Sequence, residues 1–229
     1  MKIAGLQKLT LLDFPERVAC TVFIGGCNFR CPFCHNSALV FPQDTQEMSE
    51  EAFLSFLKKR IGILDGVAIT GGEPLLSEEI VPFIEKIKAL GYAVKLDTNG
   101  SNPARLETLV RRGLVDYVAM DIKNSPEKYA LTCGLKAMDL TNIERSVHFL
   151  KQGLVPYEFR TTVVEEFHEA ADIEKIGQWL EGARAYYLQC FVDSGACLVE
   201  GLHAPSEESL ALYRALAAKY VPNTQLRGV

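Results

Sequence analysis

The sequence contains no long apolar segment and no long basic run. No stretch approaches the roughly 20 apolar residues of a membrane-spanning helix, and the first residues lack the apolar core of a secretion signal. Lysine and arginine are scattered over a chain of net charge −5, and their longest run is residues 58–60. We therefore expect neither a membrane nor a nucleic acid as the main partner.

Repeats, low-complexity tracts and long linkers are also missing. The 229 residues, 48% of them hydrophobic, suffice for one sizeable core. We expect a single domain over residues 1–229, with an entry segment at 1–16 and a tail at 221–229 whose weak alternation is compatible with a short strand. Seven cysteines without a secretion signal favour free thiols in a reducing, cytoplasmic setting.

Short apolar strand patterns alternate with capped helical patterns along the chain. Strands are expected near residues 18–24, 66–70, 92–96, 117–122, 157–164 and 185–191. Helices are expected near residues 49–60, 77–90, 102–113, 139–152, 172–180 and 206–220, with a short loop or helix at 126–131. Six βα units in series are too few to close an eight-stranded barrel. The predicted fold class is therefore α/β, a partial (β/α)6 barrel with a parallel sheet and outer helices.

Three cysteines directly follow the first predicted strand: Cys27, Cys31 and Cys34, in the spacing C-x3-C-x2-C. A structural zinc site normally has four ligands, and its C-x2-C pair is matched by a second pair further along, which is missing here. A zinc knuckle that adds His35 is disfavoured, because the adjacent Cys34 and His35 would reach one tetrahedral ion only with difficulty. Thiolates also hold iron–sulfur clusters, usually one per iron, so three cysteines around a four-iron cluster leave one iron open to another ligand.

Polar and glycine-rich residues follow the later strands. They are Gly71, Gly72 and Glu73 after the second strand, Asp97, Thr98 and Asn99 after the third, Asp121 and Lys123 after the fourth, and Arg160 within the fifth. In βα barrels the active site lies at the carboxyl ends of the strands. We therefore expect these residues to meet the three cysteines at one site.

Together these motifs resemble the radical S-adenosylmethionine superfamily. Within it, Cys-His-Asn at 34–36, Gly-Gly-Glu-Pro at 71–74, Asp-Thr-Asn-Gly at 97–100 and Asp-Ile-Lys at 121–123 are similar to activating enzymes of glycyl-radical proteins. The opening Leu-Thr-Leu-Leu-Asp-Phe-Pro at 9–15 resembles the activating proteins of anaerobic ribonucleoside-triphosphate reductase. The resemblance covers most of the chain.

The resemblance implies a set of cofactor contacts. Cys27, Cys31 and Cys34 would hold a [4Fe–4S] cluster, whose fourth iron binds S-adenosylmethionine. Phe33 and the backbone near His35 would lie by the adenine, and Asn36 would also belong to the cofactor site. Gly71, Gly72 and Glu73 would receive the methionine ammonium, and Thr98 and Asn99 would bond the ribose or the methionine end. Asp97 and Asp121 would contribute to a monovalent cation site, and Arg160 would bond the cofactor carboxylate or the ribose. Two alternatives stay open for Lys123: it orients Asp121 in the cofactor site, or it is simply solvated.

The resemblance also implies a reaction and partners. Reductive cleavage of S-adenosylmethionine would give a 5′-deoxyadenosyl radical, which takes hydrogen from a glycine Cα of a glycyl-radical enzyme. Anaerobic ribonucleotide reductase is the expected partner, a pyruvate formate-lyase type enzyme is the alternative, and reduced flavodoxin or ferredoxin is the expected electron donor. A radical enzyme for a small molecule or peptide, and a non-enzymatic metal-binding module, stay open. Cys20, Cys133 and Cys190 are expected to be structural.

Overall fold

The computed structural model describes residues 1, 3–41, 48–193 and 195–228, so Lys2 of the entry segment and Val229 of the tail lie outside the described residues. The chain groups into two compact units. The first comprises Met1–Asn28, Ala38–Ala119 and Leu154–Pro156, and the second comprises Phe29–Ser37, Met120–Gly153 and Tyr157–Val229. The single domain expected from the sequence remains a prediction. No helix of the described residues is long and apolar enough to cross a membrane.

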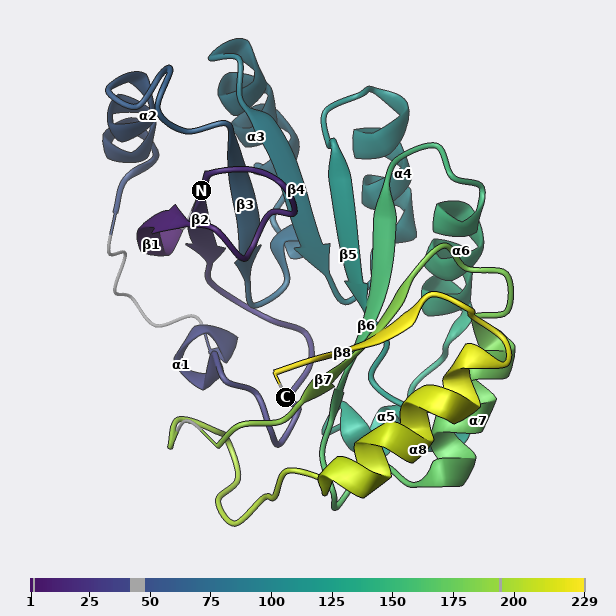
Figure 1. Cartoon of the computed structure of the whole chain (residues 1–229). Coiled ribbons are helices and arrows are strands. Elements are labelled where there is room, and N and C mark those ends of the chain that lie inside the picture. The colour runs from purple at the N-terminus through teal and green to yellow at the C-terminus, as the bar shows by residue number, and fades with distance from the viewer. Residues whose placement is uncertain (2, 42–47, 194, 229) are drawn as a thin grey trace. The chain divides into compact units, whose positions relative to one another are not determined.

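The first unit is built on strands β1 to β4 and most of β5, together with helices α2, α3 and α4 (Figure 1). The bounds are β1 (Ile3–Thr10), β2 (Ala19–Ile24), α1 (Ser37–Val40), α2 (Glu50–Lys58), β3 (Gly66–Gly71), a 3-10 turn (Pro74–Leu76), α3 (Ile80–Ala89), β4 (Ala93–Thr98), α4 (Pro103–Arg111) and β5 (Tyr117–Asp121). β1 is antiparallel to β2, whereas β2, β3 and β4 run parallel. Val67, Ala68 and Ile69 of β3 are fully buried, as expected for a strand covered on both faces.

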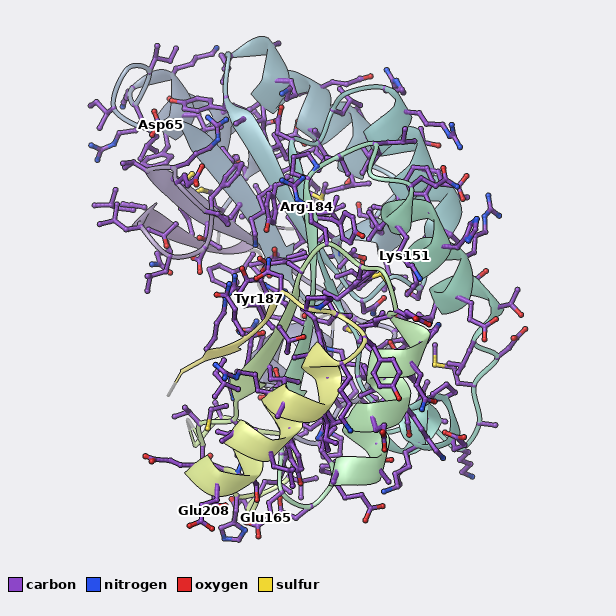
Figure 2. All side chains as sticks on the ribbon, turned by 45° about the vertical axis from the view of Figure 1, so that its right-hand side comes forward. Asp65, Lys151, Glu165, Arg184, Tyr187 and Glu208 are labelled. Atoms are coloured by element: carbon purple, nitrogen blue, oxygen red, sulfur yellow. The ribbon has the colours of Figure 1, made fainter. Side chains whose placement is uncertain are left out.

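The second unit is built on strands β6 to β8, which pair in parallel. The bounds are a 3-10 turn (Pro126–Lys128), α5 (Tyr129–Thr132), α6 (Thr141–Lys151), β6 (Tyr157–Val163), α7 (Ala170–Trp179), β7 (Tyr186–Cys190), α8 (Glu207–Ala218) and β8 (Thr224–Arg227). One face of this sheet carries the fully buried Phe159, Tyr186 and Leu188. The alternate residues, such as Arg160 and its register partner Tyr187 (Figure 2), lie on the other face, because side chains alternate along a strand.

Short polar residues begin several of these helices. Ser49 accepts a hydrogen bond from the Ala52 N–H at 3.2 Å before α2, and Ser206 accepts one from the Ser209 N–H at 3.1 Å before α8. Asn102 caps α4, which has a proline in its first turn. Such caps satisfy backbone donors that have no partner within the helix, and they explain why the helix starts were predictable.

The strand order is β1 to β8, and the six predicted strands correspond to β2 through β7. Two strands are added: β1 lies within the predicted entry segment, and β8 is the short strand considered for the tail. The predicted start of the second helix at Ser77 is wrong. Ser77 ends a 3-10 turn, its Oγ accepts a hydrogen bond from the Glu79 N–H at 3.3 Å, and α3 begins only at Ile80.

Candidate active site

In the first unit, the loop after β3 lies directly against the backbone that leads into Cys27. The Gly72 N–H donates to the Ile24 carbonyl at 2.9 Å, and the Glu73 N–H donates to the Gly26 carbonyl at 2.8 Å. A Cβ on Gly71 would collide with the backbone of Ile24, and a Cβ on Gly72 would collide with the carbonyl oxygen of Gly26. Gly71 also has φ +123°, which disfavours other residues. These two glycines are therefore required by the close approach of two loops.

The Glu73 carboxylate is buried at the ends of β3 and β4, with 1% of the residue exposed. Its Oε1 accepts hydrogen bonds from the Leu75 N–H at 2.9 Å and the Thr98 hydroxyl at 2.8 Å, and its Oε2 accepts one from the Asn99 N–H at 2.6 Å. The Asn99 side chain donates in turn to Asn28 at 2.9 Å. The structure thus brings together Glu73, Thr98 and Asn99, as predicted, and ties them to the start of the cysteine segment.

Asp97 forms an ion pair with Lys95, a partner that the sequence analysis did not consider. The two residues are two positions apart on β4, so their side chains point to the same face of the strand. Lys95 is 2% exposed, and a buried ammonium requires a negative partner. The spacing of two residues between Lys95 and Asp97 within a predicted strand was the sequence signal that could have indicated this ion pair.

In the second unit, Asp121 lies between two cations. Arg160 Nε donates to Oδ1 at 3.0 Å, and the Lys123 ammonium contacts Oδ2 at 3.1 Å. Burial raises the pKa of Asp121, but the charges of Arg160 and Lys123 prevail and lower it to about 2. Burial likewise lowers the pKa of Lys123, but Asp121 prevails and raises it above its usual value. The predicted contact between Lys123 and Asp121 is confirmed, and Arg160 joins it.

The segment with Cys31 and Cys34 contacts the residues that follow α5. The Arg30 N–H donates to the Cys133 carbonyl at 2.8 Å, and a Cβ on Gly134 would collide with the Arg30 carbonyl. A hydrogen bond from Cys133 lowers the pKa of Cys31 to about 7 against the effect of burial, and Lys123 contributes to the lowering. Because the thiolate is the metal-binding form, this environment favours Cys31 as a ligand.

Cys34 follows Cys31 in a tight turn, in which the Cys34 N–H donates to the Cys31 carbonyl at 3.0 Å. Burial raises the pKa of Cys34, although a hydrogen bond from the backbone of Asn36 and the charge of Lys123 oppose this. An N–H group directed at the sulfur is the kind of contact that tunes an iron–sulfur cluster. Asn36, predicted only as a cofactor-binding residue, therefore contacts Cys34 through its backbone.

Aromatic side chains pack around the same segment. The buried Phe33 ring lies 5.8 Å from the Phe167 ring and 6.5 Å from the His168 ring, measured between ring centroids. His35 lies 5.5 Å from Phe191. These contacts hold the Phe33 ring, which is predicted to border the adenine, and the side chain of His35, whose backbone is predicted to lie there.

The loop after β7 also holds this segment, which the sequence did not indicate. The Val199 N–H donates to the Pro32 carbonyl at 3.0 Å, and the Ser37 hydroxyl donates to the Ala196 carbonyl at 2.5 Å. Main-chain contacts of this kind depend on loop conformation rather than on residue type, so no sequence pattern marks them.

Cys27 belongs to the first unit, and Cys31 and Cys34 belong to the second. The joint action of all three, and of Asp97 with Asp121 at one cation, remains a prediction. The donor set fits an iron–sulfur cluster, since the three cysteines lie on one short stretch of the sequence, and Gly72, which has no Cβ atom, lies close to the first of them, Cys27. No three His, Cys, Asp or Glu side chains of the described residues gather as ligands of a single ion, but a four-iron cluster takes one thiolate per iron.

Comparisons with known proteins identify the family of this chain. A family model described as the Radical SAM superfamily matches residues 21–175. A protein of Methanocaldococcus jannaschii, named provisionally as a glycyl-radical enzyme activating enzyme, is 32% identical and covers 99% of this chain and 96% of its own. The pyruvate formate-lyase-activating enzyme of Listeria monocytogenes is 26% identical and covers 92% of this chain and 93% of its own.

A solved structure shares the fold. The crystal structure of a domain of pyruvate-formate lyase-activating enzyme from Bacteroides vulgatus has a TM-score of 0.58 at 18% identity, covering 71% of this chain and 99% of that one. The predicted fold class, an α/β partial (β/α)6 barrel, is confirmed, and the family implies a [4Fe–4S] cluster and S-adenosylmethionine. The chain belongs to the radical S-adenosylmethionine superfamily and, within it, to the glycyl-radical enzyme activating enzymes.

Proposed function

We propose that this chain cleaves S-adenosylmethionine reductively and installs a glycyl radical on a partner enzyme. The observation that carries the proposal is the C-x3-C-x2-C segment with the Gly71-Gly72-Glu73 loop hydrogen-bonded to the backbone that enters it. When bound, the cluster and S-adenosylmethionine supply the electron and the radical chemistry that removes a hydrogen atom from the glycine. The chain's own residues hold, orient and enclose the reacting groups.

Roles for individual residues follow from their contacts. Cys27, Cys31 and Cys34 hold the cluster, and Phe33, with the His35 and Asn36 region, borders the adenine. Glu73 places a buried negative charge behind the loop that receives the methionine ammonium, since its own oxygens bond Thr98 and Asn99. Arg160, which donates through Nε to Asp121, would bond the cofactor carboxylate or the ribose. Asp97 and Asp121 would contribute to a cation site, each already beside one lysine.

Anaerobic ribonucleoside-triphosphate reductase is the partner that we propose first, on the opening motif at residues 9–15. A pyruvate formate-lyase type enzyme is the second candidate, favoured by the near full-length likeness to the Listeria activating enzyme. Reduced flavodoxin or ferredoxin in the cytoplasm would supply the electron.

An activation assay tests the function and the partner together. The anaerobically reconstituted, reduced protein is mixed with S-adenosylmethionine and each candidate enzyme, and the glycyl radical is detected by electron paramagnetic resonance as a doublet. We expect the doublet with one candidate and none with a Cys34→Ala variant. Formation of 5′-deoxyadenosine without a radical on any candidate would instead favour a small molecule or peptide substrate.

A further inference from the structure

His168 is a buried histidine whose two ring nitrogens both have partners. It is 3% exposed, its Nε2 lies 2.9 Å from the Lys123 carbonyl oxygen, and its Nδ1 lies 3.1 Å from the Val164 N–H. Nδ1 also lies 3.3 Å from the Val164 carbonyl oxygen, but its shorter contact is with the Val164 N–H, which can only donate. Since the shortest contact of the ring is from Nε2 to a carbonyl oxygen, which only accepts, we assign the proton to Nε2. Burial lowers the pKa of His168, in keeping with this neutral form.

The ring of His168 also supports the cysteine segment. It packs edge-on against Phe33, the residue before Cys34, and the neighbouring Phe167 ring contacts Phe33 as well. His168 therefore touches two site residues from different parts of the second unit: the main chain of Lys123 after β5 and the side chain of Phe33.

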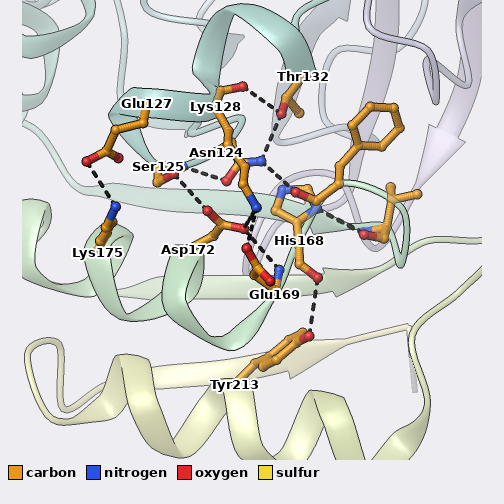
Figure 3. A network of polar contacts seen from close by, with 12 residues as sticks. Asn124, Ser125, Glu127, Lys128, Thr132, His168, Glu169, Asp172, Lys175 and Tyr213 are labelled. Atoms are coloured by element: carbon orange, nitrogen blue, oxygen red, sulfur yellow. Dashed lines mark hydrogen bonds and ion pairs between the residues drawn. The ribbon is translucent and has the colours of Figure 1, made fainter.

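A polar network keeps His168 in this position (Figure 3). The Asn124 side chain donates to the Phe167 carbonyl at 2.9 Å and to the Thr132 hydroxyl at 2.8 Å. On the other side, the Tyr213 hydroxyl donates to the His168 carbonyl at 3.2 Å. The loop after β6 is thus fixed from both directions, and the imidazole has little freedom to turn away from Lys123.

We infer that His168 is a positioning residue for the cofactor site: its Nε2–H holds the Lys123 carbonyl, and its ring supports Phe33. Fixing the Lys123 backbone fixes the origin of the side chain whose ammonium meets Asp121 at 3.1 Å. A satisfied core histidine would serve packing alone, and an apolar residue of similar size would replace it. The inference rests on the proposed cofactor contacts of Phe33 and Lys123, and it makes the Nε2 hydrogen bond the decisive element.

Two conservative variants separate positioning from packing. In His168→Gln the carboxamide nitrogen lies near the place of Nε2 and keeps a donor for Lys123, whereas in His168→Asn the shorter amide lies near Nδ1 and does not reach Lys123. Tyr213→Phe is the matched control, because it removes one hydrogen bond from the same network without touching the imidazole. Each protein is reconstituted anaerobically, its iron and sulfide are measured, and its affinity for S-adenosylmethionine is determined by equilibrium binding.

We expect the Asn variant to bind S-adenosylmethionine about three- to tenfold more weakly, the equivalent of one lost hydrogen bond, at unchanged iron content. The Gln variant should bind clearly more tightly than the Asn variant, because both lack the ring and only Gln keeps the donor for Lys123, and Tyr213→Phe should stay within about twofold of the parent. The change that S-adenosylmethionine causes in the spectrum of the reduced cluster should be altered only in the Asn variant. Equal affinities for Asn and Gln, or an equal loss in Tyr213→Phe, would refute the positioning role. If no partner enzyme acquires a glycyl radical, the proposed function fails, but the affinities for S-adenosylmethionine still decide whether His168 is a positioning residue.

Discussion

Arg160 Nε donates to Asp121 Oδ1 at 3.0 Å, while Lys123 holds Oδ2 of the same carboxylate. The pKa of Asp121 is lowered from 3.8 to about 2, so its carboxylate stabilises the fold fully above about pH 4, and this contribution is lost as the pH falls through 2. The side chain is 31% exposed, which moderates the effect.

Asp121→Asn should therefore lower the free energy of unfolding by about 1–2 kcal/mol at neutral pH. The loss arises because the attraction of the Asp121 carboxylate for Arg160 and Lys123 is removed. Urea unfolding at a series of pH values checks this prediction, and the difference from the parent should shrink between about pH 4 and pH 2. A difference that stays constant over that interval would contradict the assigned ion pairs.

The buried charge of Glu73 is also expected to affect the free energy of unfolding. Glu73→Gln keeps the shape but replaces one acceptor oxygen by an NH2 group, which would face either the Thr98 hydroxyl and Leu75 N–H or the Asn99 N–H. Two donors then meet in a buried site, and we expect a loss of about 2–3 kcal/mol in the free energy of unfolding. Thr98→Val is the control; it removes the hydrogen bond to Glu73 and the one that Thr98 Oγ1 accepts from the Gly100 N–H, but it brings no second donor against residue 73, and it should cost about 1–2 kcal/mol. Equal effects of the two variants would argue against the charged, triply bonded carboxylate.

Adding one methyl group at position 72 tests whether the cysteine segment needs the close approach of Gly72 to Gly26. Gly72→Ala places a Cβ against the Gly26 carbonyl oxygen, and the backbone before Cys27 has to shift. Gly25→Ala is the matched control, because its Cβ would meet only Ala4 Cβ at 3.7 Å, an ordinary contact. After anaerobic reconstitution, Gly72→Ala should bind clearly less iron and sulfide than Gly25→Ala. Full iron content in Gly72→Ala would show that the close approach is not needed for the cysteine segment.

The sequence predicted the strands better than it predicted the contacts between side chains. The strands β2 to β7 were predictable because each is a short apolar run between helix caps and glycines. β1 was missed because Gly5, Gln7 and Lys8 interrupt its pattern, and an antiparallel strand on one side of a sheet needs no continuous apolar run.

In the candidate site, too, some contacts could be predicted from the sequence and others could not. Glu73, Thr98 and Asn99 could be placed together because they follow neighbouring parallel strands. The partners of charged groups were harder to foresee, as Lys95 illustrates for Asp97. His168 and Cys133 touch the site from loops and short helices, where the chain path rather than a periodic pattern decides the contact.

The C-terminal strand β8 contributes to an ion pair that the sequence did not indicate. Arg227 of β8 donates to both oxygens of Glu158 on β6, at 2.6 and 2.9 Å, and its guanidinium lies 3.5 Å from the centre of the Tyr187 ring on β7. Glu158 is 1% exposed, and a buried carboxylate is stabilised by a bidentate guanidinium partner such as Arg227. Arg227→Met leaves a buried carboxylate without its guanidinium and should cost about 2–4 kcal/mol.

A double-mutant cycle separates that ion pair from the packing of Arg227 on Tyr187. Glu158→Gln, Arg227→Met and the double variant are compared by urea unfolding at neutral pH. The double variant should be more stable than the sum of the single losses predicts, by about 1–3 kcal/mol, because removing both charges leaves no unpaired group. Additive losses would mean that Glu158 and Arg227 do not depend on each other, and that β8 is held by stacking on Tyr187 and by the strand hydrogen bonds alone.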